Sequence, residues 1–240
     1  MPMPELAVDT AAIVIKGSFE PSRLSPTELA NQGLVTAGQL TDAVQKFSTD
    51  DISIFETKRI RFVANREIIE LTAQQSDEFE PLRDLAVGIL RLFISESVSV
   101  LGINRNVHFA AKDEEAWDAV GDALTPKGIW SAILDAPGML SLTLQAARPG
   151  KFEGYRQITI QPSNSIRNGV FVSHNDHYTL DLLEKPGALT RDQLRVLAQR
   201  PAKPNPNKVL TAIEVLEGEW ESSMNRADAV VQRVAQEAKS

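Results

Sequence analysis

The chain contains no cysteine among its 240 residues. Disulfide bonds, thiolate zinc sites and cysteine nucleophiles are therefore excluded. Positive charge is also scarce, because 25 Lys and Arg residues stand against 32 Asp and Glu residues and leave a net charge of −7. Sequence-independent nucleic-acid binding needs many cations that neutralise phosphates, so we expect no nucleic-acid partner.

Long apolar runs are missing as well. No segment approaches the roughly 20 apolar residues that span a bilayer, and an acidic surface discourages adhesion to anionic membranes. The N-terminal stretch lacks a basic region and holds only a short apolar run, so we expect it to lead into a strand and not to act as a signal peptide. With 42% hydrophobic and 24% charged residues, the composition is typical of a soluble globular protein, and we predict a cytoplasmic location.

Two kinds of periodicity alternate along the chain. Residues 79–93 carry apolar side chains at three- and four-residue steps, which predicts an amphipathic helix. Residues 113–124 repeat this spacing, and 36–47 predict a shorter helix. Alternating and β-branched runs predict strands within 11–19, 51–74, 97–111, 138–147, 152–161 and 168–183. The tryptophans Trp117, Trp130 and Trp220 all lie in apolar patterns and are expected in the core.

The order of these elements predicts the fold class. Strands and helices do not alternate strictly, so a doubly wound parallel sheet is not expected. We predict an α+β fold with a largely antiparallel sheet and helices packed on one face; two ferredoxin-like halves are one arrangement that fits. The predicted units are a core over 1–183 with sub-lobes 1–111 and 112–183, a turn- and proline-rich linker with a short helix over 184–207, and a C-terminal helix over 208–240.

The strongest periodic signal lies between Val209 and Ala238, a stretch without proline. At 1.5 Å per residue a helix here is about 45 Å long, so it either crosses a whole face of the fold or projects to a partner. Gly218 weakens such a helix by about 1 kcal/mol relative to alanine, which makes a break nearby an alternative. The candidate partner-binding residues on its apolar stripe are Ile213, Leu216, Trp220, Met224 and Val231.

Two of the three histidines lie in VFVSHNDHYTL, residues 170–180. If this stretch is one continuous strand, His174 and Asp176 share a face with Tyr178, while His177 points to the other face. If Asn175-Asp176 forms a two-residue turn, the two histidines face each other across a hairpin. Asn-Asp is a poorer turn pair than Asn-Gly, because the second position also needs a positive φ, so we favour the continuous strand.

A metal site is one interpretation of these residues. His174 and Asp176 could reach one cation, and His108 on a second polar strand face could complete three ligands, as a catalytic zinc requires; His177 is a further candidate ligand or proton-transfer group. The favoured interpretation is a solvated strand face, because antiparallel sheets often expose one face to water. No spaced catalytic motif supports the metal site.

The order of three segments is similar to that of a known group of proteins. AAIVIKGSF, then RIRFVANREIIEL with FEPLRDLAVGILRLF and VSVLGINRNVHF, then NDHYTLDL resemble a sporadically distributed family of uncharacterised prokaryotic proteins of about this length. The resemblance spans roughly residues 11–183 and consists of pattern, without a sharp motif. It implies an α+β fold and no assigned chemistry, so no site residue is carried over from it.

These observations favour a non-enzymatic protein that self-associates or docks a protein partner through its C-terminal helix. The alternative is a metal-dependent hydrolase-like enzyme that uses His108, His174 and Asp176. The first hypothesis needs no cofactor, and the second needs a divalent metal.

Overall fold

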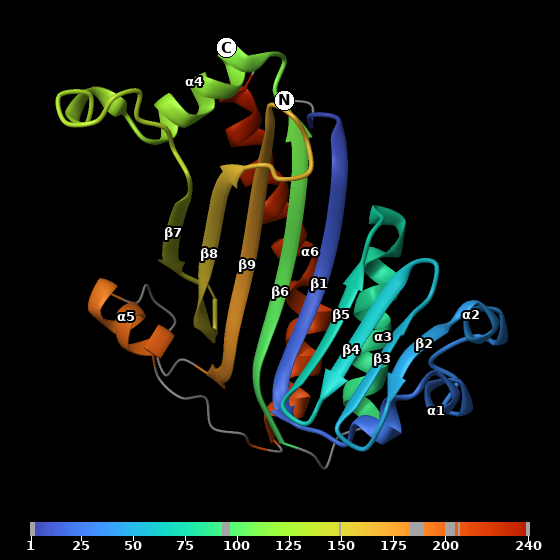
Figure 1. Ribbon diagram of the computed structural model, residues 1–240. Coiled ribbons are helices and arrows are strands. Elements are labelled where there is room, and N and C mark those ends of the chain that lie inside the picture. Colours follow the sequence, from blue (N-terminus) through green and yellow to red (C-terminus); the bar gives the residue numbers. More distant parts are fainter. Residues whose placement is uncertain are drawn as a thin grey trace.

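A single antiparallel sheet organises the computed structural model, which describes residues 3–92, 97–148, 150–182, 190–199, 205 and 207–238. Its strand order is β2-β3-β4-β5-β1-β6-β9-β8-β7 (Figure 1). The strands are β1 (Leu6–Ser18), β2 (Val44–Ser48), β3 (Ile52–Glu56), β4 (Ile60–Asn65), β5 (Ile68–Ala73), β6 (Ser97–Ala110), β7 (Leu142–Ala147), β8 (Phe152–Pro162) and β9 (Gly169–Leu182). The helices are α1 (Pro26–Asn31), α2 (Ala37–Asp42), α3 (Phe79–Leu92), α4 (Glu114–Leu124), α5 (Arg191–Gln199) and α6 (Asn207–Glu237), with short 3-10 turns at Pro21–Leu24, Ser76–Glu78 and Lys127–Ile129.

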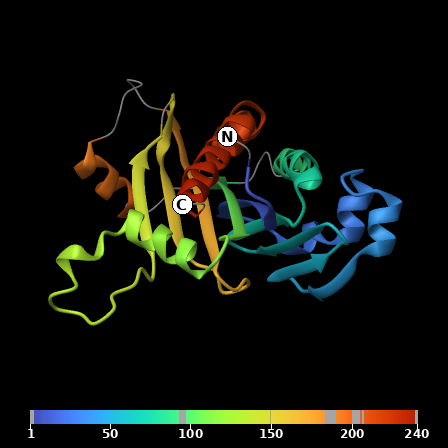
Figure 2. The same cartoon turned by 90° about the horizontal axis from the view of Figure 1, so that it is seen from above.

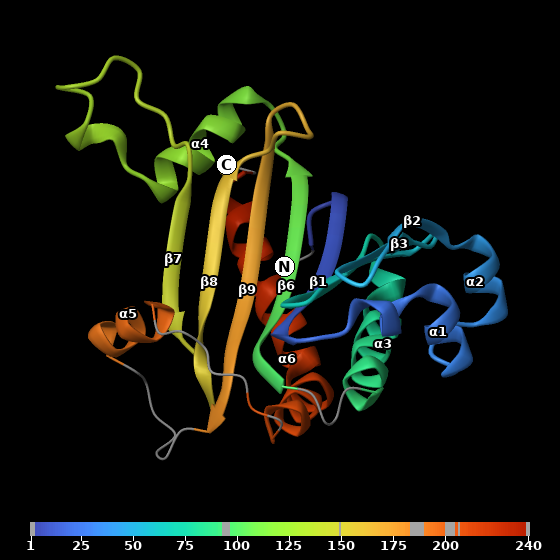
Figure 3. The same cartoon turned by 60° about the horizontal axis from the view of Figure 1, so that its bottom comes forward.

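The two longest helices, α6 and α3, lie side by side on one face of the sheet. Figure 1 shows α6 behind β6 and β9, and Figure 2 shows α6 and α3 on the same side when the molecule is seen from above. Helices α4 and α5 lie toward the β7 end of the sheet, and α1 and α2 lie beyond β2 (Figure 3). The predicted α+β class, with an antiparallel sheet and its main helices on one face, is confirmed.

The chain repeats one topology. A long strand, a helical connection and an antiparallel meander follow one another twice. The last strand of each meander pairs with the long strand that precedes it, so that β5 pairs with β1 and β9 pairs with β6. Strands β1 and β6 then pair antiparallel at the centre. The repeat starts at β6, so the boundary predicted after residue 111 separates β6 from the meander with which it pairs. Every ladder between the named strands is antiparallel, and two ferredoxin-like halves are not confirmed.

Two clusters of buried apolar side chains form the core. The first cluster lies beneath α3 and the N-terminal half of α6, where Trp220 packs with residues of β1, β4 and β5. The second lies beneath α4 and the C-terminal half of α6, where Val231 and Val234 pack with residues of β6, β8 and β9. Helix α6 therefore joins both clusters.

Some predicted boundaries were wrong. The helix predicted over 36–47 ends at Asp42, because Val44–Ser48 pairs with β3 as an edge strand. Helix α6 continues through Gly218 without a break. The short helix of the predicted linker is α5, and Thr190 and Gln193 form a capping box at its start: the backbone N–H of each donates to the side chain of the other, over 2.8 Å and 3.3 Å. Residues 201–204, in the proline-rich part of that linker, lie outside the described residues.

Within the part of the chain that the structure describes, no helix is both long enough and apolar enough to cross a membrane.

Candidate functional site

The predicted partner-binding stripe is covered by the chain itself. Leu216, Trp220 and Val231 are buried against the sheet, and Ile213 and Met224 are partly buried against the first core cluster. The sequence left open whether this helix packs on its own fold or projects, and the structure places it across the fold. The five residues are therefore not exposed for a partner.

Charged side chains also fix α6 to the body of the protein. Among the described residues, six ion pairs join it to the rest of the fold, and the helix supplies the cation in two of them and the carboxylate in four. From its N-terminus the pairs are Lys208–Asp181, Glu214–Lys151, Glu217–Arg91, Glu219–Arg148, Arg226–Asp176 and Asp228–Arg105. Because three of them involve the buried side chains of Arg148, Asp176 and Arg105, removing α6 would leave uncompensated charge inside the fold.

The sheet separates the histidines that were grouped as a metal site. The stretch 170–180 is a continuous strand, as favoured, and pairs with β6 so that Arg105 lies opposite His174 and His108 lies opposite Phe171. His174 and Asp176 therefore point to the helix-covered face, whereas His108 points to the opposite face. His177 shares the face of His108 but lies six residues from its partner position, about 20 Å along the strand.

The three predicted metal ligands thus cannot bind one ion. No group of three or more acidic or histidine side chains suited to a metal occurs among the described residues. The physical reason is that successive side chains of a strand point to opposite faces of the sheet. Whether His108 and His174 share a face therefore depends on the pairing register of β6 with β9, which the sequence of neither strand reveals.

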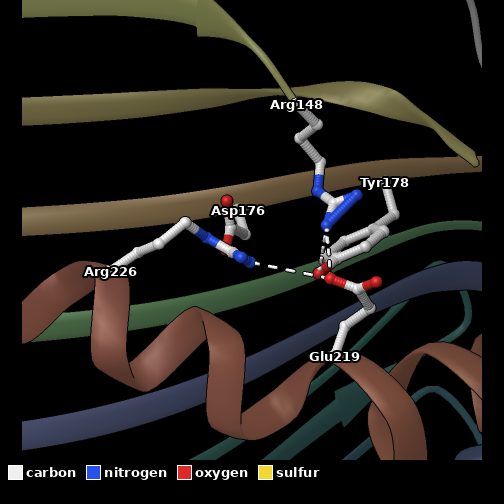
Figure 4. Close-up of polar contacts among 5 residues, drawn as sticks. All are labelled: Arg148, Asp176, Tyr178, Glu219 and Arg226. Atoms are coloured by element: carbon white, nitrogen blue, oxygen red, sulfur yellow. Dashed lines mark hydrogen bonds and ion pairs between the residues drawn. The ribbon is translucent and has the colours of Figure 1, made fainter. Parts of the chain in front are cut away.

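Asp176 instead belongs to a buried network that spans β9, α6 and the segment after β7 (Figure 4). Its Oδ2 accepts hydrogen bonds from Arg226, with Nε at 3.1 Å and a terminal nitrogen at 2.6 Å. Arg148 donates from one nitrogen to the Tyr178 hydroxyl at 2.9 Å and to Glu219 at 3.0 Å, and its guanidinium lies 3.7 Å from the centre of the Tyr178 ring. The network therefore contains two arginines and two carboxylates around a buried phenol.

Burial controls the protonation of the neutral groups in this region. It raises the pKa of Tyr178 far above its usual value, and it lowers the pKa of His174, an effect that Arg226, Arg156 and Arg105 strengthen. Tyr178 is fully buried and His174 is 2% exposed, so neither can meet a substrate from solvent. We interpret the network as the anchor of α6 and not as a catalytic site.

The exposed candidate for a binding surface is an apolar segment between α4 and β7. Residues 125–141 extend away from the sheet (Figures 1 and 3) and hold only two charged residues, Lys127 and Asp135. Ile129 and Ile133 are both 74% exposed and Leu140 is 86% exposed, although each side chain is large and apolar. With Trp130 and Leu134 they form the apolar segment patch, which consists of Ile129, Trp130, Ile133, Leu134 and Leu140.

This segment leads directly into the edge strand β7. Thr143, Leu144, Gln145 and Ala146 are all exposed, and the strand Leu142–Ala147 contains no charge and no proline. Its pairing with β8 shows no register shift. Natural edges are usually blunted by charge, proline or bulges, because their free N–H and C=O groups otherwise pair with another strand.

The opposite edge of the sheet has those protections. Strand β2 has a register shift between Gln45 and Phe47, and Lys46 between them forms an ion pair with Glu56 at 2.5 Å. Of the two sheet edges, β7 is therefore the less protected one, although α5 lies beside one end of it (Figure 1). Sequence reasoning expected Trp130 in the core, and that expectation was wrong, since the residue is 47% exposed. The absence of charge across 138–147 was the signal that could have indicated the open edge.

No known protein-family model matches the chain, and no curated protein is significantly similar to it in sequence. The resemblance to the prokaryotic family therefore stays a prediction.

Proposed function

We propose that the protein is a non-enzymatic self-associating module, in which β7 pairs with β7 of a second copy of the chain. The apolar segment patch then packs over the two paired strands. The observation that carries this proposal is five large exposed apolar side chains immediately before an uncharged edge strand. The absence of cysteine favours a cytoplasmic location for this assembly.

A second copy fits because two identical strands can pair antiparallel about a two-fold axis, so that each edge strand binds the same edge strand of the other copy. If Leu144 lies opposite Leu144 of the second copy, Leu142 lies opposite Ala146, and Thr143 lies opposite Gln145. Each of these pairs keeps its side chains on one face of the joined sheet. The exposed Leu144 side chains then cover each other beside the apolar segment patch.

The extent of the surface is consistent with a specific interface. Residues 125–147 form a continuous stretch that supplies roughly the 20–30 residues per partner of a standard interface. A lipid surface is a poorer occupant, because the chain carries a net charge of −7 and acidic residues of α4 such as Asp122 lie beside the segment. The stripe of α6 has no part in this assembly, since it is covered within the chain.

Sedimentation velocity over a range of protein concentrations tests the proposal. We expect the wild-type chain to sediment as a dimer, and Leu144→Lys to shift it to the monomer because a charge at the joint is desolvated on pairing. Trp130→Ser should weaken the dimer as well. The matched control is Val44→Lys on the protected edge β2, which should leave the dimer intact.

A wild-type chain that remains monomeric at every concentration would contradict the proposal. So would a dimer that Leu144→Lys and Val44→Lys weaken equally. Thermal melts of each variant distinguish loss of assembly from loss of folding, since Leu144 and Val44 are both exposed and neither change should lower the melting temperature.

A further inference from the structure

The face of the sheet opposite α6 and α3 carries an ordered array of uncharged polar side chains. Figure 1 looks onto this face, and Figure 2 shows α6 and α3 on its far side. Two neighbouring rows cross the strands of the second half, and their members lie directly opposite one another in the register. One row is Thr143, Thr159, Ser173, Asn106 and Thr10, and the other is Gln145, Gln157, Asn175 and Asn104.

We call these nine residues the uncharged rows. At about 4.8 Å per strand they extend for about 20 Å across the sheet. An ordinary solvated strand face mixes lysine, glutamate and arginine with threonine, and the same face of the first half does so with Glu56, Arg61 and Glu70. The uncharged rows contain no ionisable side chain, which distinguishes them from the rest of the face.

Sheet stability does not explain this composition. Asn104, Asn106 and Asn175 lie in the central strands β6 and β9, although asparagine is depleted from strands. Asn104 lies directly opposite Asn175. Residues that oppose local propensity at such positions commonly serve a function.

Few hydrogen bonds among the described residues engage the side chains of the rows. Thr143 and Thr159 share one at 3.2 Å, Thr10 donates to the backbone oxygen of Asn106 at 3.4 Å, and Asn104 donates to that of Ala12 at 3.5 Å. The Oδ1 atom of Asn175 is enclosed and has no hydrogen-bond partner within the described residues. An enclosed acceptor without a partner costs free energy.

Aromatic pairs bracket the rows at both ends. Tyr155 stacks on His177 with ring centres 4.3 Å apart and planes at 15°, and His108 packs against Phe171 at 4.8 Å. The two pairs lie about 20 Å apart along β9. Burial lowers the pKa of His177 to about 4, with Lys16 adding to the effect, and burial also lowers the pKa of His108. Both imidazoles are therefore neutral at physiological pH, and the two aromatic pairs add no charge to the rows.

From this arrangement we infer that the uncharged rows and the two aromatic pairs bind a neutral oligosaccharide chain that lies along β8, β9 and β6. Amide and hydroxyl groups both donate and accept, as sugar hydroxyls do. The C–H faces of sugar rings stack on aromatic rings, and the distance between the pairs suits a ligand of several sugar units. This site does not depend on the proposed self-association.

Other occupants fit the chemistry less well. A nucleic acid would place phosphates over rows that contain no cation, although phosphate contacts supply most of the affinity for nucleic acids. An apolar protein surface would leave the amides buried without partners. A neutral, hydroxyl-rich ligand avoids both costs.

Titration of 15N-labelled protein with neutral hexasaccharides, followed by NMR, tests the inference. The probes are cellohexaose, chitohexaose, maltohexaose and mannohexaose, each up to millimolar concentration. We expect at least one of them to shift the side-chain amide signals of Asn104, Asn106, Asn175, Gln145 and Gln157. Tyr155→Ala and Asn175→Ala should each weaken that binding by about tenfold or more, because each removes a stacking or hydrogen-bonding group that the ligand contacts.

Gln157→Glu provides a variant that keeps the side-chain size, and it should weaken binding because it places a charge among the rows. Arg61→Gln, on the same face but outside the rows, is the matched control and should bind as the wild type does. No binding of any of the four probes would overturn the inference, as would binding that these variants leave unchanged. Binding of a heparin hexasaccharide or of a thymidine hexanucleotide in place of the neutral probes would also overturn it, in favour of an anionic ligand.

Discussion

Buried charges decide how α6 is held. Asp176 is fully buried, and its only hydrogen-bond donor among the described side chains is Arg226, which is itself 19% exposed at the side chain. Such a pair contributes little net stability relative to apolar residues, because desolvation offsets the attraction. Losing one partner is different, since the remaining charge stays buried without compensation.

We therefore expect Asp176→Ala to destabilise the protein by about 3–5 kcal/mol. The variant removes the carboxylate that Arg226 contacts at 2.6 Å, leaves this arginine only the longer contact with Glu219 at 3.8 Å, and raises the excess of positive charge near Arg148. Urea unfolding curves measure the change. The control is Asp51→Ala, whose carboxylate pairs with Arg66 at 2.5 Å on the surface with a 74% exposed side chain, and it should shift stability by no more than about 0.5 kcal/mol. Similar effects of the two changes would contradict the assignment of Asp176 to a buried anchor.

At the scale of elements, local patterns predicted most of the strands and helices. Within the strands predicted over 51–74, Ile60, Phe62 and Ala64 point to the core and Arg61 to solvent, as the alternation of a strand requires. The period of α3 likewise predicted its buried face. These predictions succeeded because each depends on residues within one element.

Predictions that depended on two elements failed. His108 and His174 lie on opposite faces because the pairing of β6 with β9 sets their relation, and neither strand alone contains that register. The stripe on α6 predicted burial correctly but did not reveal whether its cover was the same chain. The weakly protected edge β7 was missed because an edge is defined by the strand order, which local sequence does not specify.

Alanine substitutions at two glycines test how closely individual elements are packed. Gly218 lies within α6, and a Cβ there would meet no heavy atom within 4 Å. Gly218→Ala should therefore stabilise the protein by about 0.5–1 kcal/mol, because alanine favours the helix. Gly154 on β8 is the opposite case, since a Cβ there would lie 1.9 Å from the carbonyl oxygen of His177.

Thermal melts distinguish the two substitutions. Gly218→Ala should raise the melting temperature by about 1–4 °C, whereas Gly154→Ala should lower it, because the strands β8 and β9 must separate to admit the methyl group. A lower melting temperature for Gly218→Ala would contradict the continuous helix through that position.

At the scale of the whole molecule, the repeated topology raises the question of whether the two halves fold together. Each half has its own meander, but the first apolar cluster also includes residues of the second half such as Leu101, Phe152 and Tyr178. Two further connections join the halves: the central ladder between β1 and β6, and helix α6, which contributes Trp220 to the first cluster and Val231 to the second. Because one rigid helix is shared, opening either cluster removes support from the other.

We expect calorimetry to show a single unfolding transition that substitutions in either cluster shift as a whole. Trp220→Ala should cost about 3–5 kcal/mol through the cavity that it leaves, and Val231→Ala about 1.5–3 kcal/mol through lost burial. For a chain of this size each kcal/mol lowers the melting temperature by about 2–4 °C. Two separable transitions, one moved by Trp220→Ala and the other by Val231→Ala, would instead mean that each half unfolds independently and that α6 does not couple them.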